Sequence, residues 1–139
     1  MVAFNYEIDF KLEDEARVEN WISTCIESYD FEEGELNYIF CDDEYLLKLN
    51  VEFLEHDTFT DVISFDYTMG KLISGDIFIS IERVRDNAND FNVSFNEELK
   101  RVMVHGILHY CGYKDKSESD ELIMRQKEDE KIQLFHVEQ

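Results

Sequence analysis

The spacing of apolar residues changes repeatedly along this chain of 139 residues, and this change constrains the fold more than any other feature. Val2, Phe4 and Tyr6 alternate with smaller or polar residues, which predicts a strand with one buried face over residues 2–9. Over residues 13–29 apolar side chains recur every three or four positions, which predicts a helix. Strand and helix periods in one short chain favour an α+β fold in which helices pack on a sheet.

The same patterns divide the rest of the chain into three further strands and four further helices. The strands are expected over residues 36–40, 62–65 and 77–81, with a loop or hairpin at 66–70 and a turn at Ser74-Gly75-Asp76 that introduces the last strand. The helices are expected from Asp42 or Asp43 to near His56, from about Ile81 to Asp90, from the capping residue Ser94 to Gly112, and from Ser117 or Ser119 through Leu122, Ile123, Gln126 and Ile132. We therefore predict a single α+β domain over residues 1–139, with about four strands in a mixed sheet packed with about five helices.

Composition favours a folded chain that is neither exported nor inserted in a membrane. Hydrophobic residues make up 44% of the chain, which supports a packed core although 33% of residues are charged. The three cysteines form no CxxC pair, and no apolar run approaches the length of a membrane span. We expect a cytoplasmic protein with reduced thiols.

The net charge of −20 argues against a polyanionic partner for the surface as a whole. The segment from Leu99 to Ser117 differs, because it holds four basic residues and only one acid, Asp115. Two interpretations stay open at this point: a chance cluster of surface charges, or the rim of an anion-binding site.

A histidine pair inside the predicted helix at 94–112 indicates a metal site. His105 and His109 are four residues apart, so both imidazoles lie on one face of the helix. Gly112 can end the helix in a left-handed conformation and turn the chain so that Asp115 comes back toward the histidines. Three protein ligands leave one coordination position open, as in catalytic metal centres. We predict one divalent metal ion on His105, His109 and Asp115.

Histidines at this spacing on a helix, followed by a glycine and a third ligand, resemble the zincin pattern. Gly106 stands where a zincin peptidase has the glutamate that acts as general base. The zincin-like helix therefore predicts metal binding but disfavours peptide cleavage.

Further motifs resemble the YbeY family of metal-dependent endoribonucleases and ribosomal RNA maturation factors. The family's metal helix corresponds here to His105, Gly106, Leu108, His109, Gly112 and Tyr113. Upstream family motifs correspond to Leu49-Asn50, Thr60-Asp61-Val62-Ile63-Ser64-Phe65 and Gly75-Asp76-Ile77. The resemblance implies cleavage of single-stranded RNA in ribosomal RNA maturation and ribosome quality control. It also implies a ribosomal RNA precursor as substrate, ribosomal or assembly proteins as further partners, and no role for DNA or a membrane.

Two departures bear on activity. The third ligand in most of the family is histidine, whereas this chain has Asp115, a hard oxygen ligand that widens the choice of metal toward manganese or iron. Zinc remains our first choice. A family arginine implicated in function is replaced here by Leu54. A noncatalytic ribosome-assembly factor with a fold-stabilising metal is therefore the alternative hypothesis, and a zincin-like peptidase is a more distant one.

For RNA cleavage, the metal would polarise a phosphate oxygen, and the nucleophile would be either a metal-activated water or the adjacent ribose hydroxyl. Candidate phosphate contacts are Arg101, one turn before His105, and Lys114 and Lys116, which flank the third ligand.

The other reactive or charged residues near this segment are interpreted mainly as structural. Cys111 is expected to be a buried thiol that points away from the site. Asp76 is expected either to form part of a turn or to orient a ligand. Glu128-Asp129-Glu130 is expected to form a solvated acidic face that could meet a basic protein.

Overall fold

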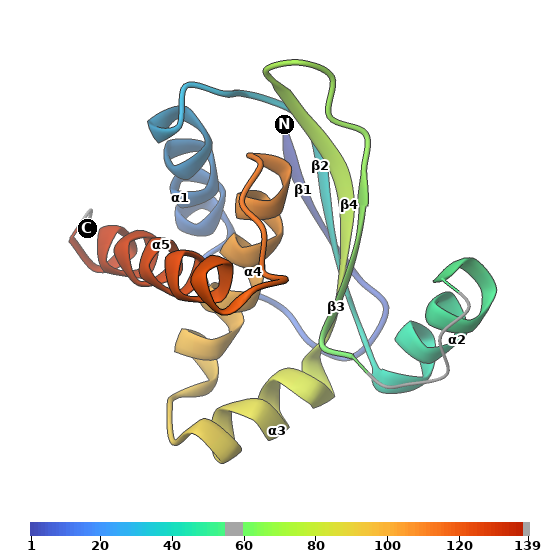
Figure 1. The fold of residues 1–139 in the computed structure, drawn as a ribbon. Helices are drawn as coiled ribbons and strands as arrows, with labels where there is room; N and C mark the ends of the chain where they lie inside the picture. The colour runs from blue at the N-terminus through green and yellow to red at the C-terminus, as the bar shows by residue number, and fades with distance from the viewer. Residues whose placement is uncertain (55–59, 138–139) are drawn as a thin grey trace.

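Four strands and five helices are present in the computed structural model, which describes residues 1–54 and 60–137 (Figure 1). In chain order they are β1 (Val2–Tyr6), α1 (Glu15–Ser28), β2 (Glu32–Cys41), α2 (Asp43–Leu54), β3 (Val62–Asp66), β4 (Leu72–Ser80), α3 (Ile81–Phe91), α4 (Phe95–Tyr110) and α5 (Glu118–Val137). The predicted α+β class and the predicted order of elements are confirmed. The expected end of the second helix near His56 lies outside the described residues. Within the described part of the chain, no helix combines the length and apolarity needed to cross a membrane.

The sheet is mixed and has the strand order β1-β2-β4-β3. β1, β2 and β4 run parallel, and β3 pairs antiparallel with β4 at one edge. α1, α4 and α5 cover one face of the sheet, whereas α2 lies against the other face (Figure 1). α1 connects the parallel strands β1 and β2, whereas α4 follows the last strand and α3 and packs on the same face of the sheet as α1.

β4 begins at Leu72, so the prediction of a turn at Ser74-Gly75-Asp76 is wrong. These residues lie inside the strand, where Gly75 and Asp76 pair with Leu36 and Asn37 of β2. A side chain at Gly75 would collide with the hydroxyl of Tyr110 on α4. Glycine occurs at this position because α4 packs closely against the strand, and not because the chain turns there.

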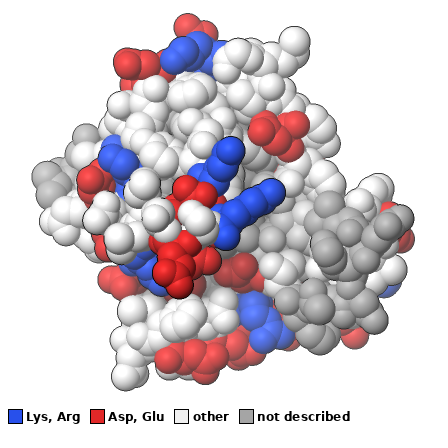
Figure 2. All heavy atoms as spheres, in the orientation of Figure 1, with Lys and Arg blue, Asp and Glu red and all other residues white. Residues whose placement is uncertain are grey.

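Acidic side chains are spread over the surface, in keeping with the net charge of −20 (Figure 2). Basic side chains project from the middle of the face in Figure 2, over the loop that follows α4, with acidic side chains beside them. The surface around the end of α4 is therefore mixed in charge.

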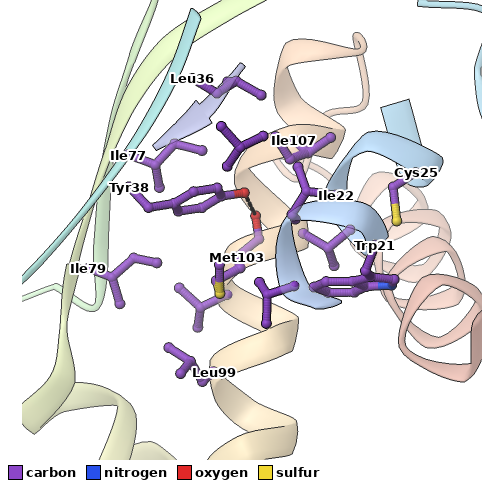
Figure 3. Close-up of a cluster of buried hydrophobic side chains, with 14 of the residues drawn as sticks. Trp21, Ile22, Cys25, Leu36, Tyr38, Ile77, Ile79, Leu99, Met103 and Ile107 are labelled. Carbon is purple, nitrogen blue, oxygen red and sulfur yellow. Dashed lines mark hydrogen bonds between the residues drawn. The ribbon is translucent and has the colours of Figure 1, made fainter. Parts of the chain in front are cut away.

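α4 is the central helix and packs its apolar faces into the main hydrophobic core (Figure 3). Ser94 caps its first turn by accepting a hydrogen bond from the backbone N–H of Glu97, as the capping pattern predicts. The buried hydroxyl of Tyr38 on β2 donates to the carbonyl oxygen of Met103 at 2.9 Å. A Cβ atom at Gly106 would lie only 2.9 Å from Cδ1 of Ile77, so this glycine lets α4 approach β4 closely. The sheet thus fixes the height and rotation of the helix that carries both histidines.

α5 packs on the core with only one of the apolar residues that we named for this helix, Ile132. Leu122 and Ile123 are exposed, and the buried side chains are Met124, Glu128, Ile132 and Phe135. The indole N–H of Trp21 on α1 donates to the carbonyl oxygen of Lys131 at 2.6 Å. Because α1 holds α5 in this rotation, Glu128 points inward toward α4.

Candidate metal centre

The two histidines lie on one partly exposed stripe of an otherwise buried helix. From Arg101 to Tyr110, only Arg101, His105 and His109 are not buried, and they are four residues apart. This spacing stacks the three side chains along one face of α4. The stripe faces α5 and the loop after α4, so these two segments complete the site.

Gly112 turns the chain back over the end of α4. Its φ is 100°, in the left-handed region that favours glycine. The N–H of Gly112 donates to the carbonyl oxygen of His109, and the N–H of Tyr113 donates to that of Leu108, both at 3.0 Å. These two bonds form a Schellman motif, which ends a helix and reverses the chain. The turn brings Asp115 to the histidines, as predicted.

Three ligand atoms meet at this point. The Nε2 atoms of His105 and His109 are 3.0 Å apart, and Oδ2 of Asp115 lies 3.3 Å from the first and 3.4 Å from the second. Ligands about 2.0–2.1 Å from a tetrahedral zinc ion lie about 3.3 Å from one another. The three atoms therefore have the mutual spacing of one face of a tetrahedral metal site, and the group can hold a metal ion.

The hydrogen bonds on the far side of each imidazole point both Nε2 lone pairs into the site. Nδ1 of His109 lies 3.1 Å from the carbonyl oxygen of Tyr113, which can only accept, so Nδ1 carries the proton. Nδ1 of His105 lies 2.6 Å from Oε2 of Glu128, and an ionised carboxylate likewise only accepts. Two lone pairs and a carboxylate oxygen then converge without a donor between them. A cation satisfies this set of ligand atoms, so the residues present fit a divalent metal.

Glu128 is the residue that the sequence analysis missed, and the prediction that it lies on a solvated face is wrong. It is only 5% exposed, and its second oxygen accepts a hydrogen bond from Nη1 of Arg101 at 2.9 Å. The guanidinium of Arg101 also pairs with Asp129 at 2.7 Å. Carboxylates that hold the outer nitrogen of a metal-binding histidine orient the ring and increase its basicity.

A sequence signal for Glu128 exists in hindsight. It lies four residues after Met124 and four before Ile132, both of which are buried on the same face of α5. An acid in an apolar stripe indicates a buried charged partner, because an unpaired buried carboxylate is costly.

The electrostatics of His105 reflect this contact. Burial alone would lower the pKa of His105, but the hydrogen bond and the charge of Glu128 outweigh it and hold that pKa above its ordinary value. Asp115 and Asp61 act in the same direction. The surroundings of the ring therefore favour positive charge at the site, whether from a proton or from a metal ion.

The predicted phosphate contacts lie in different settings. Lys114 and Lys116 are exposed in the loop after α4. Arg101 is held by Glu128 and Asp129, so a phosphate would have to compete with two carboxylates. Carboxylates from α5, among them Glu118 and Glu121, line the hollow beside His105, so the basic segment does not form a purely basic rim.

Asp76 and Cys111 do not contact the ligand group. The carboxylate of Asp76 accepts a hydrogen bond from Nδ2 of Asn37 at 3.0 Å, and Glu128 orients His105 instead. Cys111 is a free thiol that is only partly buried rather than fully buried, packs against the hydrophobic core, and has its pKa raised to about 11 by burial. Neither residue adds a ligand atom to the described site.

Comparison with known proteins agrees with the motifs. The family model described as Endoribonuclease YbeY matches residues 4–136. A protein named Endoribonuclease YbeY from Flavobacterium johnsoniae is 68% identical over 139 residues, which cover 100% of both chains. The protein of the same name from Flavobacterium psychrophilum is 66% identical over 139 residues, 100% of this chain and 99% of the relative. The solution structure of TM1509 from Thermotoga maritima matches with a TM-score of 0.66 at 25% identity, covering 97% of this chain and 89% of that one.

Proposed function

Because this chain belongs to the YbeY family of endoribonucleases, we propose that it is a metal-dependent endoribonuclease. Its substrate is single-stranded RNA, and its role lies in ribosomal RNA maturation and ribosome quality control. The metal is one divalent ion per chain, with zinc as the first choice.

The convergence of the three ligand atoms is the observation that carries this proposal. Their separations of 3.0, 3.3 and 3.4 Å suit a small divalent ion. Protein supplies three ligand atoms, which leaves coordination space for a substrate oxygen or a water. A metal held there would polarise a phosphate oxygen and lower the pKa of a bound water.

The surrounding residues hold the ligands in place before substrate arrives. Glu128 fixes the tautomer of His105, and the carbonyl oxygen of Tyr113 fixes that of His109. Arg101 neutralises Glu128, which would otherwise be an unpaired buried charge. Preorganised ligands of this kind do not have to reorient when the substrate binds.

The setting of Gly106 argues against peptide cleavage. A side chain there would point toward Ile77 in the core rather than toward the ligand group, so the position cannot supply a general base without moving α4. Phosphodiester cleavage makes no such demand on this position.

The test measures cleavage of a single-stranded fragment of ribosomal RNA precursor by the metal-loaded protein. We expect cleavage by the wild type, no cleavage after chelation, and loss of cleavage in His109→Ala. His136→Ala is the matched control, because His136 is an exposed histidine near the end of α5, away from the ligand group, and we expect it to stay active.

Equal cleavage by wild type and His109→Ala would point to a contaminating nuclease and remove the proposal. A DNA strand of the same sequence tests whether the ribose hydroxyl is required. Cleavage of the DNA strand would exclude the ribose hydroxyl as the nucleophile, because DNA lacks this group, and would leave an activated water.

A further inference from the structure

A hollow on one side of His105 is not used by the ligand group. It has a volume of about 230 Å³ and lies between the start of β3, the end of α3, α4 and α5. This space corresponds to roughly seven or eight water molecules at about 30 Å³ each, enough for one base and part of its sugar. A second hollow of about 480 Å³ lies on the other side, next to Asp115. His105 and Arg125 line both hollows. An RNA strand that runs from one hollow to the other therefore passes the ligand group.

Phe91 presents an aromatic ring to the smaller hollow. It is the last residue of α3 and is 58% exposed. Among the described residues its ring forms no aromatic pair and no cation–π contact, unlike the phenylalanines of the core. An exposed ring beside a catalytic centre is the usual platform on which a base of single-stranded nucleic acid stacks.

Arg125 is the cation available between the two hollows. It is exposed, and within the described residues no carboxylate lies within ion-pair distance of it. Arg101 lines the same hollow but is committed to Glu128 and Asp129. Arg125 is therefore better placed than Arg101 to bind a phosphate, and its planar guanidinium suits one.

Carboxyl groups in the smaller hollow do not exclude RNA. The carboxylate of Glu128 is already paired with Arg101 and His105, and burial raises the pKa of both Asp61 and Glu98. Carboxyl oxygens are also acceptors for the amino groups of bases. The hollow thus offers a stacking ring, acceptors for a base edge and a cation at its rim.

We propose that this hollow binds one nucleotide of single-stranded RNA beside the cleaved phosphate, with the base on Phe91 and the phosphate against Arg125. The proposal rests on the proposed ribonuclease function and names two substrate-binding residues that lie outside the histidine motif. Arg125 would also supply a cation to a chain that has Leu54 in place of the functional arginine of the YbeY family.

The test measures RNA binding separately from cleavage. A short single-stranded RNA that contains 2-aminopurine is titrated with metal-free protein in the presence of chelator, and anisotropy and base fluorescence are recorded at several salt concentrations. Phe91→Ala should raise Kd about tenfold and remove the fluorescence quenching that stacking causes, whereas Phe91→Tyr should keep both. Arg125→Gln should lower the slope of log K against log salt by about 0.7, the loss of one phosphate contact on a single strand.

Two substitutions serve as matched controls. Tyr67→Ala removes an aromatic ring that is 59% exposed in the connection between β3 and β4 and does not line the hollow. Lys127→Gln removes a cation of α5 that pairs with Glu130. Neither control should change Kd by more than about twofold.

Binding by Phe91→Ala and Arg125→Gln that equals the wild type would overturn the inference, even if the wild type cleaves RNA. Failure of the metal-loaded wild type to cleave RNA, with loss of binding in the two variants, would instead overturn the ribonuclease proposal and leave a nucleotide-binding site. Absence of RNA binding by the wild type would refute the inference outright.

Discussion

Glu128→Gln tests whether the carboxylate on α5 controls the metal site on α4. The substitution keeps the shape of the side chain and removes its charge. It changes the 2.6 Å contact with Nδ1 of His105 and the 2.9 Å contact with Arg101. Glu128 is only 5% exposed, so water does not reach this position to compensate for the loss of the carboxylate.

The expected magnitude follows from the chemistry of the His105 contact. A hydrogen bond to a charged group contributes about 1.5–3 kcal/mol, and a neutral one about 0.5–1.5 kcal/mol. The difference of about 1–2 kcal/mol corresponds to a loss of metal affinity of roughly tenfold. This value lies within the range of about 10–100-fold seen when residues that orient metal ligands are replaced.

The assay is a competition titration of zinc into metal-free protein against a chelating dye. Asp129→Asn is the matched control, because Asp129 also pairs with Arg101 but is exposed and makes no contact with His105. We expect a change of less than about twofold for the control. If Glu128→Gln binds zinc as tightly as the wild type, then Glu128 does not orient His105 and our description of the site is wrong.

Three further predictions concern the fold around the site, and thermal unfolding measures each of them. Gly106→Ala places a methyl group 2.9 Å from Cδ1 of Ile77. It should cost about 1 kcal/mol of stability, since overpacking outweighs the gain in helix propensity. Adding Ile77→Val, which deletes that methyl, should recover part of the loss, and strict additivity would contradict the packing argument. Gly112→Ala forces alanine into a φ of 100° and should cost about 1–2 kcal/mol; an unchanged melting temperature would refute the role of the turn. Burial raises the pKa of Glu98 in the folded protein above its value in the unfolded chain. Ionisation of this carboxyl therefore lowers the free energy of unfolding as the pH rises from the pKa of the unfolded chain through that of the folded protein. Glu98→Gln should therefore melt higher than the wild type at pH 7 and gain less at pH 4, and an equal gain at both would count against this assignment.

Local signals in the sequence predicted the ligand group because its geometry depends on one helix and one turn. The four-residue spacing of His105 and His109 fixes their common face, and Gly112 fixes the return of Asp115. The strand and helix order follows from hydrophobic period for the same reason: each pattern is local to its own element.

Features that depend on contacts between distant segments could not be predicted in this way. Glu128 reaches His105 only because Trp21 and the core set the rotation of α5, which leaves Leu122 and Ile123 outside. Gly75 looked like a turn residue, but pairing with β2 and the closeness of Tyr110 hold it inside a strand.

Reconstitution of metal-free protein with zinc, followed by the rate of single-stranded RNA cleavage, tests the central claim most directly. We predict that the rate rises with added zinc and levels off at one equivalent per chain. Asp115→Ala should show no such rise at one equivalent of zinc, while the exposed control Asp9→Asn should follow the wild type. Cleavage that is independent of added metal, or an Asp115→Ala variant that responds like the wild type, would contradict this claim.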